Sequence, residues 1–122
     1  MFFSRFENLV KKIILEDTDS LLVDSKEVDH FIEDARRYNI WDMFSFSKKE
    51  FIKWSFYIDN PFLKLPYNAK YKIYRSQIVG LFLLSTDYFR NKMAPDKPVH
   101  YIAIYNPYSS PCSNPFSNLF YS

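Results

Sequence analysis

Apolar residues recur at helical spacing near the start of the chain. Phe2, Phe6, Leu9 and Ile13 are three or four residues apart, and polar residues lie between them. This spacing is typical of an amphipathic helix with one apolar face. The polar stretch from residue 16 to residue 20 then interrupts the pattern, because short polar side chains compete for backbone hydrogen bonds.

A second helix is predicted to begin at about Ser25. Asp24 and Glu27 have the spacing of a capping box, in which each side chain accepts a hydrogen bond from the other residue's backbone N–H. The residues that then repeat at helical intervals are expected on the apolar face of this helix: Val28, Phe31, Ile32, Ala35 and Tyr38.

A third helix is predicted after Ser47, because Ser47 and Glu50 form a second capping-box pair just before an apolar run. Asp59, Asn60 and Pro61 are expected to end it, since the residue before proline is pushed out of the helical region. The residues expected on one face of this helix are Phe51, Trp54, Ser55 and Ile58.

The longest helix is predicted over residues 67–92, after Pro66. Ile73 and Ile78 are placed on its inward face. Residues 78–84 are apolar nearly all round, which predicts a central helix packed on more than one side. Gly80 costs about 1 kcal/mol relative to alanine inside a helix, so we expect another helix to approach closely there.

The helical spacing of apolar residues ends near the C-terminus. Residues 99–105 are β-branched and aromatic and predict one strand or one arm of a hairpin, whereas residues 106–122 are uncharged and predict an irregular tail. The predicted fold class is therefore all-α with one short strand or hairpin near the C-terminus. Residues 1–105 are expected to form a single helical domain.

Composition adds several exclusions. Lys and Arg number 16 against 14 Asp and Glu, and a net charge of +2 does not favour direct binding to nucleic acid. Cys112 is the single cysteine, which rules out an intramolecular disulfide and a cysteine-rich zinc site. No apolar run approaches the roughly twenty residues of a membrane span. We therefore predict an intracellular protein that does not associate with membranes.

One short motif could carry chemistry. Asp17-Thr18-Asp19-Ser20 resembles the metal-binding hairpin of family B DNA polymerases, although Glu16 stands where that family has a small residue. We favour a solvated loop between two helices. His30 and His100 lie on different predicted elements, and the glycines that phosphate-binding loops require are missing. We therefore predict no catalytic residues, no metal, no cofactor and no enzymatic activity.

A longer pattern points to a family. Trp54 is followed by Phe62-x-x-Leu65, Ala69-Lys70 and Ile73-Tyr74-Arg75-Ser76, which resembles the signature that joins the third to fifth helices of nuclear hormone receptor ligand-binding domains, especially the divergent nematode branch. The chain departs from that signature at Phe56, where the family usually has lysine, and at Ala69, where it has aspartate. The likeness covers the N-terminal half of such a domain, and residues 119–121 lack the glutamate of an activation helix.

The resemblance implies a layered helical sandwich that opens into an apolar cavity, dimerises and recruits coregulators in the nucleus. It places Asp87, Tyr88, Phe89 and Arg90 in a continuation of the central helix. It also implies a cavity wall made by Trp54, Ile58, Leu83, Leu84 and Tyr88, with Arg90 near the polar end of a ligand. The competing interpretation is that all six are packing residues of a small helical domain.

The predicted function is a non-enzymatic binding module that resembles a truncated nuclear receptor ligand-binding domain. Its partner would be a small apolar ligand or, in the preferred version, a protein partner or a second copy. We keep two alternatives from other classes. One is a small structural subunit of a larger, mitochondrial complex, and the remote one is a polymerase-like fragment that uses Asp17 and Asp19.

Overall fold

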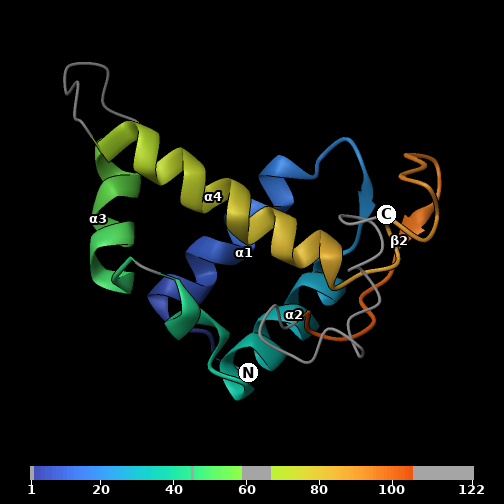
Figure 1. Cartoon of the computed structure of the whole chain (residues 1–122), viewed down its shortest axis with the longest axis horizontal. Coiled ribbons are helices and arrows are strands. Elements are labelled where there is room, and N and C mark those ends of the chain that lie inside the picture. The colour runs from blue at the N-terminus through green and yellow to red at the C-terminus, as the bar shows by residue number, and fades with distance from the viewer. Residues whose placement is uncertain (1, 45, 59–66, 106–122) are drawn as a thin grey trace.

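The computed structural model describes residues 2–44, 46–58 and 67–105 (Figure 1). The described chain is mostly helical and has one short pair of parallel strands, so the predicted fold class is confirmed. Its elements are α1 (Arg5–Asp17), β1 (Leu22–Val23), α2 (Ser25–Arg37), the 3₁₀ helix η1 (Ile40–Met43), α3 (Lys48–Ile58), α4 (Tyr67–Leu84) and β2 (Pro98–Val99).

Helix α1 is the hub of the domain, because it contacts α2, α3 and α4. A capping box starts it: the Glu7 N–H donates to Ser4 Oγ at 3.2 Å, and the Ser4 N–H donates to Glu7 Oε1 at 2.8 Å. Placing Phe2 on the apolar face was wrong, because Phe2 precedes the cap and is 97 % exposed. The helix instead buries Phe6, Val10, Ile13 and Ile14.

Helix α2 begins where the sequence predicts, but its cap differs. Asp24 Oδ1 accepts a hydrogen bond from the Lys26 N–H at 2.9 Å, as an N-cap should. Glu27 does not return to Asp24; its Oε2 accepts from the Tyr101 N–H at 2.7 Å. The predicted apolar face is buried except for Tyr38, which follows the last helical turn and is 57 % exposed.

Helix α3 follows its predicted cap. The Glu50 N–H donates to Ser47 Oγ at 3.0 Å, which satisfies one of the N–H groups left free at the first turn. Phe51 is fully buried and Trp54 nearly so, in agreement with their predicted face. The predicted stop at 59–61 and the connector to Pro66 lie outside the described residues.

Helix α4 ends at Leu84, eight residues before the predicted limit of Lys92. The Ser85 hydroxyl donates to the Leu81 carbonyl at 2.8 Å, and the Thr86 hydroxyl donates to the Leu83 carbonyl at 2.7 Å. The helical hydrogen-bond pattern ends because the Asp87 N–H donates to the His100 carbonyl at 3.0 Å and not to the Leu83 carbonyl four residues before it. The chain then turns, with Lys92 in the left-handed region at φ 56°. The predicted helical continuation over 87–90 is therefore wrong.

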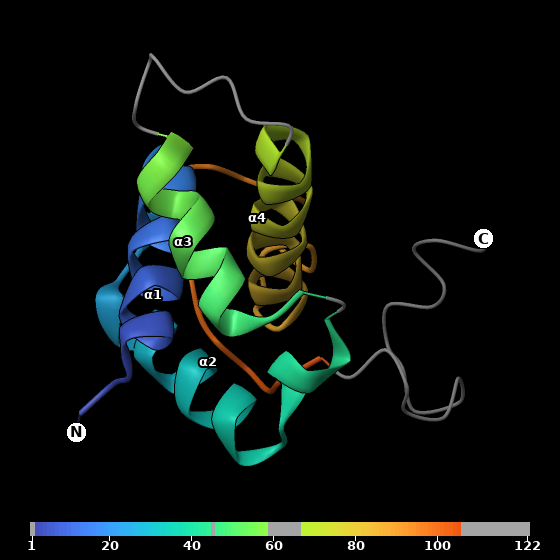
Figure 2. The same ribbon diagram turned by 90° about the vertical axis from the view of Figure 1, so that its left-hand side faces the viewer.

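Helix α4 packs on one side. Ile78 and Phe82 are fully buried against the rest of the domain, and Leu81 is 8 % exposed. Ile73, which was expected to point inward, is 55 % exposed. A Cβ added at Gly80 meets no atom within 4 Å, so the expected close helix approach is wrong. Figure 2 shows α1 and α3 on one side of α4, and no helix of the described chain covers the opposite side.

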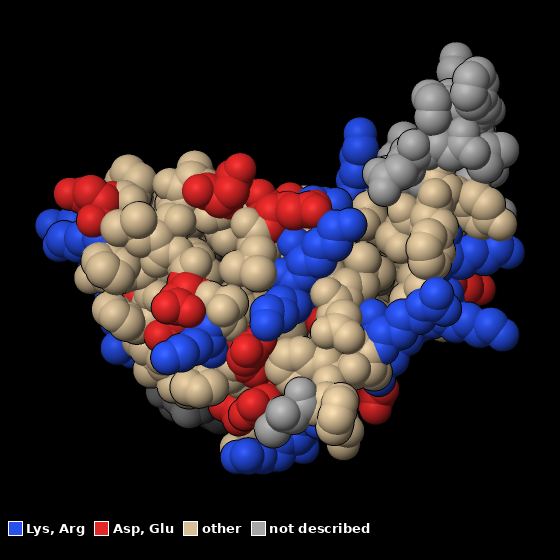
Figure 3. Space-filling view, turned by 180° about the vertical axis from the view of Figure 1, so that it is seen from behind, with Lys and Arg blue, Asp and Glu red and all other residues tan. Residues whose placement is uncertain are grey.

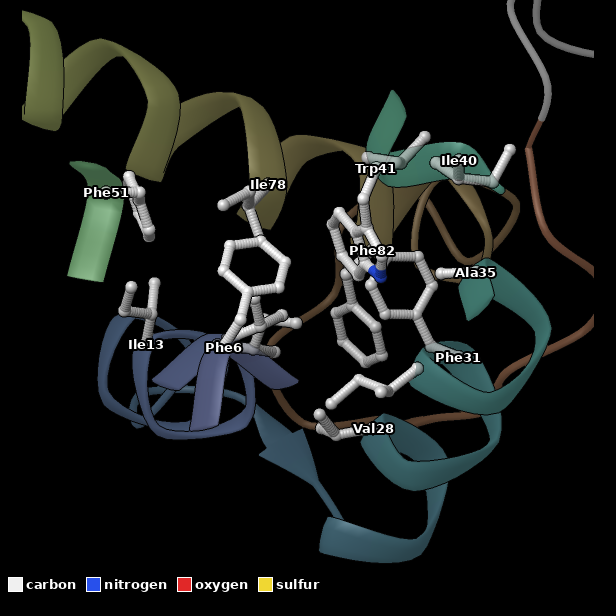
Figure 4. Close-up of a cluster of buried hydrophobic side chains, with 14 of the residues drawn as sticks. Phe6, Ile13, Val28, Phe31, Ala35, Ile40, Trp41, Phe51, Ile78 and Phe82 are labelled. Carbon is white, nitrogen blue, oxygen red and sulfur yellow. The ribbon is translucent and has the colours of Figure 1, made fainter. Parts of the chain in front are cut away.

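The core is a cluster of aromatic and branched side chains contributed by all the helices (Figure 4). Phe6 of α1 meets Trp41 of η1 edge to face, with ring centroids 5.3 Å apart. Phe51 stacks on Tyr71, with centroids 5.0 Å apart, and so connects α3 to α4. Edge-to-face and offset contacts of this kind are the favoured arrangements of aromatic pairs.

The β structure is smaller than predicted. β1 and β2 pair in parallel, with Leu22 opposite Pro98 and Val23 opposite Val99. Thr86 forms an isolated antiparallel bridge with Tyr101, and the remainder of the predicted strand over 99–105 is irregular. The segment leaves the ladder because its N–H groups bond to Ser85 and Glu27 instead. The predicted tail, 106–122, lies outside the described residues.

None of the helices within the described ranges has both the length and the apolar character required to cross a membrane.

Candidate functional site

One face of α4 is open to solvent and carries an unusual set of side chains. We define the outer stripe as Ala69, Ile73, Ser76, Gly80 and Leu84, which are three or four residues apart and so share one side of the helix. Gly80 and Leu84 are half-buried, and the other three are exposed. A stripe of small and apolar residues allows a second helix to approach closely.

Two lysines flank the N-terminal half of the outer stripe. Lys70 and Lys72 are both exposed. When helical residues are spaced 3.6 per turn, Lys70 lies about 60° to one side of Ile73 and Lys72 about 100° to the other side. The stripe therefore combines an apolar centre with a basic rim at one end.

The opposite face of α4 is fixed to α1 by an ion-pair network. The Arg75 guanidinium donates to both carboxylate oxygens of Asp17, from Nε at 2.9 Å and from Nη2 at 2.7 Å, and also to Glu16 Oε2 at 3.0 Å. The hydrogen bonds with Asp17 are the main reason why the pKa of Arg75 is raised, and burial opposes them. Arg75 lies about 160° around the helix from Ile73, so its pairing with α1 agrees with the outward position of the outer stripe.

The same network bears on the polymerase-like motif. Asp17 ends α1, and the turn that follows begins at Thr18, whose hydroxyl donates to the Ile14 carbonyl. Both Asp17 oxygens accept hydrogen bonds from Arg75, so a metal ion would have to displace this guanidinium. Within the part of the chain that the structure describes, no group of three or more potential metal ligands gathers.

A second ion pair joins α1 to α2. The Arg36 guanidinium donates to Glu7 Oε2 at 2.7 Å and to Oε1 at 2.8 Å. Burial alone would raise the pKa of Glu7, but the hydrogen bonds from Arg36 and Ser4 outweigh it, so the pKa lies below its ordinary value. Glu7 therefore remains ionised at neutral pH, although its side chain is only 7 % exposed.

The C-terminal segment is held against α2 through Tyr101. Its N–H donates to Glu27, and its hydroxyl donates to Asp34 Oδ2. Burial raises the pKa of Tyr101, and the hydrogen bond to Asp34 raises it further, so the hydroxyl keeps its proton. These two contacts place residues 98–105 between α2 and the end of α4.

Asp87 and His100 close the turn after α4. The His100 N–H donates to Asp87 Oδ1 at 2.8 Å, and His100 Nδ1 lies 3.2 Å from Asp87 Oδ2. Burial acts to raise the pKa of Asp87, but the hydrogen bonds from His100 lower it overall. His30 lies elsewhere, beside the Tyr101 ring. Both histidines are exposed, as the sequence predicts for surface positions.

The six residues predicted to line a ligand cavity lie at two ends of α4. Trp54 of α3 stacks on Tyr74, with ring centroids 6.2 Å apart, near the start of α4. Leu84 lies ten residues further along the helix, which corresponds to roughly 15 Å of axial rise. The side chain of Ile58 is outside the described set.

The other four of these residues share one end of the molecule. Leu83 and Leu84 belong to the last turn of α4 and are half-buried. Tyr88 meets Phe89 edge to face at 5.3 Å in the turn that follows, and Arg90 is exposed there. Leu83, Leu84, Tyr88 and Arg90 thus lie at the C-terminal end of α4 and in the turn that follows it. Trp54 lies near the other end of α4. Their role in ligand binding remains a prediction.

Charge is mixed over the surface. Figure 3 shows Lys and Arg side chains interspersed with Asp and Glu on the face seen from behind, and uncharged surface lies between them. Several charged side chains of the described chain pair directly, such as Lys11 with Asp29 at 2.9 Å. This face therefore has no continuous basic stripe of the kind that follows a phosphate backbone.

Comparisons with protein-family models, with curated proteins and with solved structures find no match to this chain. The class that the structure defines is a small, mostly helical domain. The resemblance to nuclear receptors remains a prediction from the residue pattern around Trp54 and Ile73.

The sequence reasoning missed the outer stripe, because it placed Ile73 on the inward face. A signal was present: residues 69, 73, 76, 80 and 84 repeat at helical spacing, and lysines flank them. It also missed the Ser4–Glu7 capping box, whose spacing is as clear as that of Ser47 and Glu50. The pairing of Arg75 with Asp17 joins distant segments and has no local signal.

Proposed function

We propose that this chain is a non-enzymatic binding module that docks an apolar helix of a protein partner on the outer stripe of α4. The observation that carries the proposal is the one-sided burial of α4: Phe82 is fully buried, whereas Ile73 is 55 % exposed and a Cβ added at Gly80 would meet no atom of the described residues within 4 Å. Exposed apolar surface of this extent on a helix favours association, because covering it removes that surface from water.

The composition of the stripe favours a helix as its occupant. Gly80 and Ser76 have minimal side chains, so a partner backbone can approach closely, while Ile73 and Leu84 supply apolar contact at either end. Lys70 and Lys72 beside the stripe favour a partner whose flanking residues are acidic. An amphipathic helix that lies in an apolar groove is a common mode of recognition.

The resemblance to nuclear receptors gives this binding a biological setting. In that family, the helix that corresponds to α4 is covered on both sides by other helices and takes part in coregulator recruitment. The corresponding role here is transcription-related binding of a coregulator in the nucleus, with the partner helix on the side of α4 that no helix of the described chain covers. In the same role, the chain would also bind a small apolar ligand near Leu83, Leu84 and Tyr88.

The test uses a synthetic amphipathic peptide with leucines on one face and glutamates at the flanks, titrated into the full chain and followed by fluorescence anisotropy. Gly80→Arg places a long cationic side chain on the stripe, where a Cβ meets nothing within 4 Å, so the fold is retained. We expect binding to weaken by about tenfold or more in this variant. Ser20→Arg, the same charge change in an exposed turn, should bind like the unmodified chain.

Two results would contradict the proposal. One is equal affinity of the unmodified chain and Gly80→Arg, because the peptide would then bind elsewhere. The other is concentration-dependent dimerisation in sedimentation experiments that Gly80→Arg abolishes, because the occupant would then be a second copy and not a different protein.

A further inference from the structure

A separate pocket lies on the inner side of the domain, where α1, α3 and the first half of α4 meet. Its volume is about 250 Å³. From α4 it takes Tyr71 and Arg75, which lie on the opposite side of the helix from the outer stripe. Of the six residues predicted to line a receptor-like cavity, the five whose side chains are described do not contribute to it. It is therefore independent of both surfaces discussed above.

The walls of the pocket are apolar at depth. Ile13 of α1 is 1 % exposed and Tyr71 of α4 is 4 % exposed, so both present their inner surfaces to the pocket from fully packed positions. Leu9 and Ile52 are half-buried and extend the apolar wall toward the opening. A ligand that fills this pocket would therefore cover apolar side chains at depth as well as the polar groups of the lining.

The rim of the pocket is cationic. Arg5, Lys12 and Arg75 line it together with one carboxylate, that of Glu16. Glu16 accepts from Arg75 at 3.0 Å and lies 3.9 Å from Lys12. The cations in the lining thus outnumber the carboxylates, and a negative group at the rim would be favoured.

Arg5 is the cation best placed to receive a ligand. It is exposed at the first position of α1, and its guanidinium carbon lies 5.5 Å from the centroid of the Phe56 ring. Phe56 is itself 62 % exposed and lines the same pocket. No ion pair with a carboxylate is described for Arg5, in contrast to Arg75, which holds Asp17 with both Nε and Nη2. The Arg5 guanidinium can therefore direct its N–H donors to a ligand while it stays close to the Phe56 ring.

We propose that this pocket binds a small amphipathic carboxylate, with the carboxylate on Arg5 at the rim and the hydrocarbon part on Leu9, Ile13, Ile52 and Tyr71. The volume of about 250 Å³ lies just below the range of about 300–1,000 Å³ that is typical of pockets for drug-sized molecules, so the pocket fits a smaller ligand. A planar guanidinium matches a carboxylate through paired hydrogen bonds, which gives the head group its orientation. A bare inorganic anion would leave the apolar wall uncovered, and a cation would face the positive rim.

The first measurement compares octanoate with 1-octanol, which have equal carbon chains and differ in the charge of the head group. Both are titrated into the full chain and followed through backbone amide shifts in NMR. We expect octanoate to bind about tenfold more tightly than 1-octanol and to weaken as salt is raised, because its extra affinity is electrostatic at a partly exposed rim. The shifts should be largest around Leu9, Ile52 and Tyr71.

Variants then assign the site. Arg5→Gln should reduce octanoate affinity by about tenfold and leave 1-octanol binding unchanged, whereas Lys26→Gln, an equal charge change at an exposed position of α2, should alter neither. Ser55→Leu adds volume at the wall and should weaken both ligands while the helical circular dichroism is retained. Equal affinity for the two ligands, or an Arg5→Gln variant that binds octanoate as before, would overturn the proposal. Neither result bears on the outer stripe, since that surface shares no residue with the pocket.

Discussion

The rings of Phe31 in α2 and Phe82 in α4 meet edge to face, with centroids 5.4 Å apart and planes at 76°. Both side chains are fully buried, and their contact joins the second helix of the chain to the last. This contact, together with Ile78, explains why α4 is bound firmly to the domain although only one of its sides is covered.

Phe82→Ala should therefore lower the free energy of unfolding by about 3–5 kcal/mol, because it removes a large buried ring and leaves a cavity. Urea denaturation followed by circular dichroism measures this loss. Ile73→Ala, on the exposed side of the same helix, should change stability by no more than about 0.5 kcal/mol. A similar loss in both variants would mean that α4 is buried all round.

The Tyr101 hydroxyl should contribute measurably to holding the C-terminal segment. In Tyr101→Phe, Asp34 loses a hydrogen bond at a half-buried position, so we expect a loss of about 2 kcal/mol in thermal or chemical denaturation. Tyr38→Phe provides the matched control, since Tyr38 is 57 % exposed and the change should be close to neutral. An unchanged Tyr101→Phe variant would show that the contact with Asp34 adds nothing to stability.

The Glu7 carboxylate predicts a loss of stability in acid. Its pKa is lower in the folded chain than in the unfolded chain, so the unfolded state binds the proton more readily. The stabilisation is therefore complete above the ordinary glutamate pKa of about 4.3 and is lost as the pH falls through the folded value. Asp87 acts with the same sign, because its pKa is also lowered.

Denaturation midpoints measured from pH 7 down to pH 3 test this prediction. Glu7→Gln should be less stable than the unmodified chain at pH 7, and the difference should shrink as the pH falls. The residual acid sensitivity of the variant then reports on Asp87 and the remaining carboxylates. A difference that stays constant with pH would contradict the role given to the ionised Glu7.

Much of the fold could be predicted from local signals. Ser47 and Asp24 cap the third and second helices, because an N-cap needs only the residue and its immediate neighbours. The apolar faces of α2 and α3 follow from periodicity, and Phe31 and Phe51 are buried as expected. The all-helical class follows from the same patterns.

Other features depend on contacts between distant segments. Glu27 has the spacing of a capping-box partner, yet it accepts from Tyr101, which competes successfully for the carboxylate. The end of α4 is set by Ser85, which bonds both to Leu81 and, through its Oγ, to the Tyr105 N–H. The sequence did not show which side of residues 78–84 faces the core, because a segment that is apolar all round has no hydrophobic periodicity.

The apolar character of the candidate site could be predicted from the sequence, but its position on α4 could not. The sequence indicated that residues 78–84 are apolar nearly all round and predicted packing on more than one side, so it did not show which side is open. The buried Ile78 and Phe82 and the pairing of Arg75 with Asp17 and Glu16 mark the side of α4 that faces the domain. Once this pairing is known, the outward position of Ile73 and Gly80 follows from helical geometry.

The central claim is that α4 is packed by one side and leaves Gly80 facing open space, and the stability of Gly80→Ala tests it most directly. Alanine is the better helix former, and its added Cβ would meet no atom within 4 Å. We predict that the free energy of unfolding in urea rises by about 0.5–1 kcal/mol. A fall of similar size would show that another element packs tightly against Gly80, and it would contradict an open outer stripe.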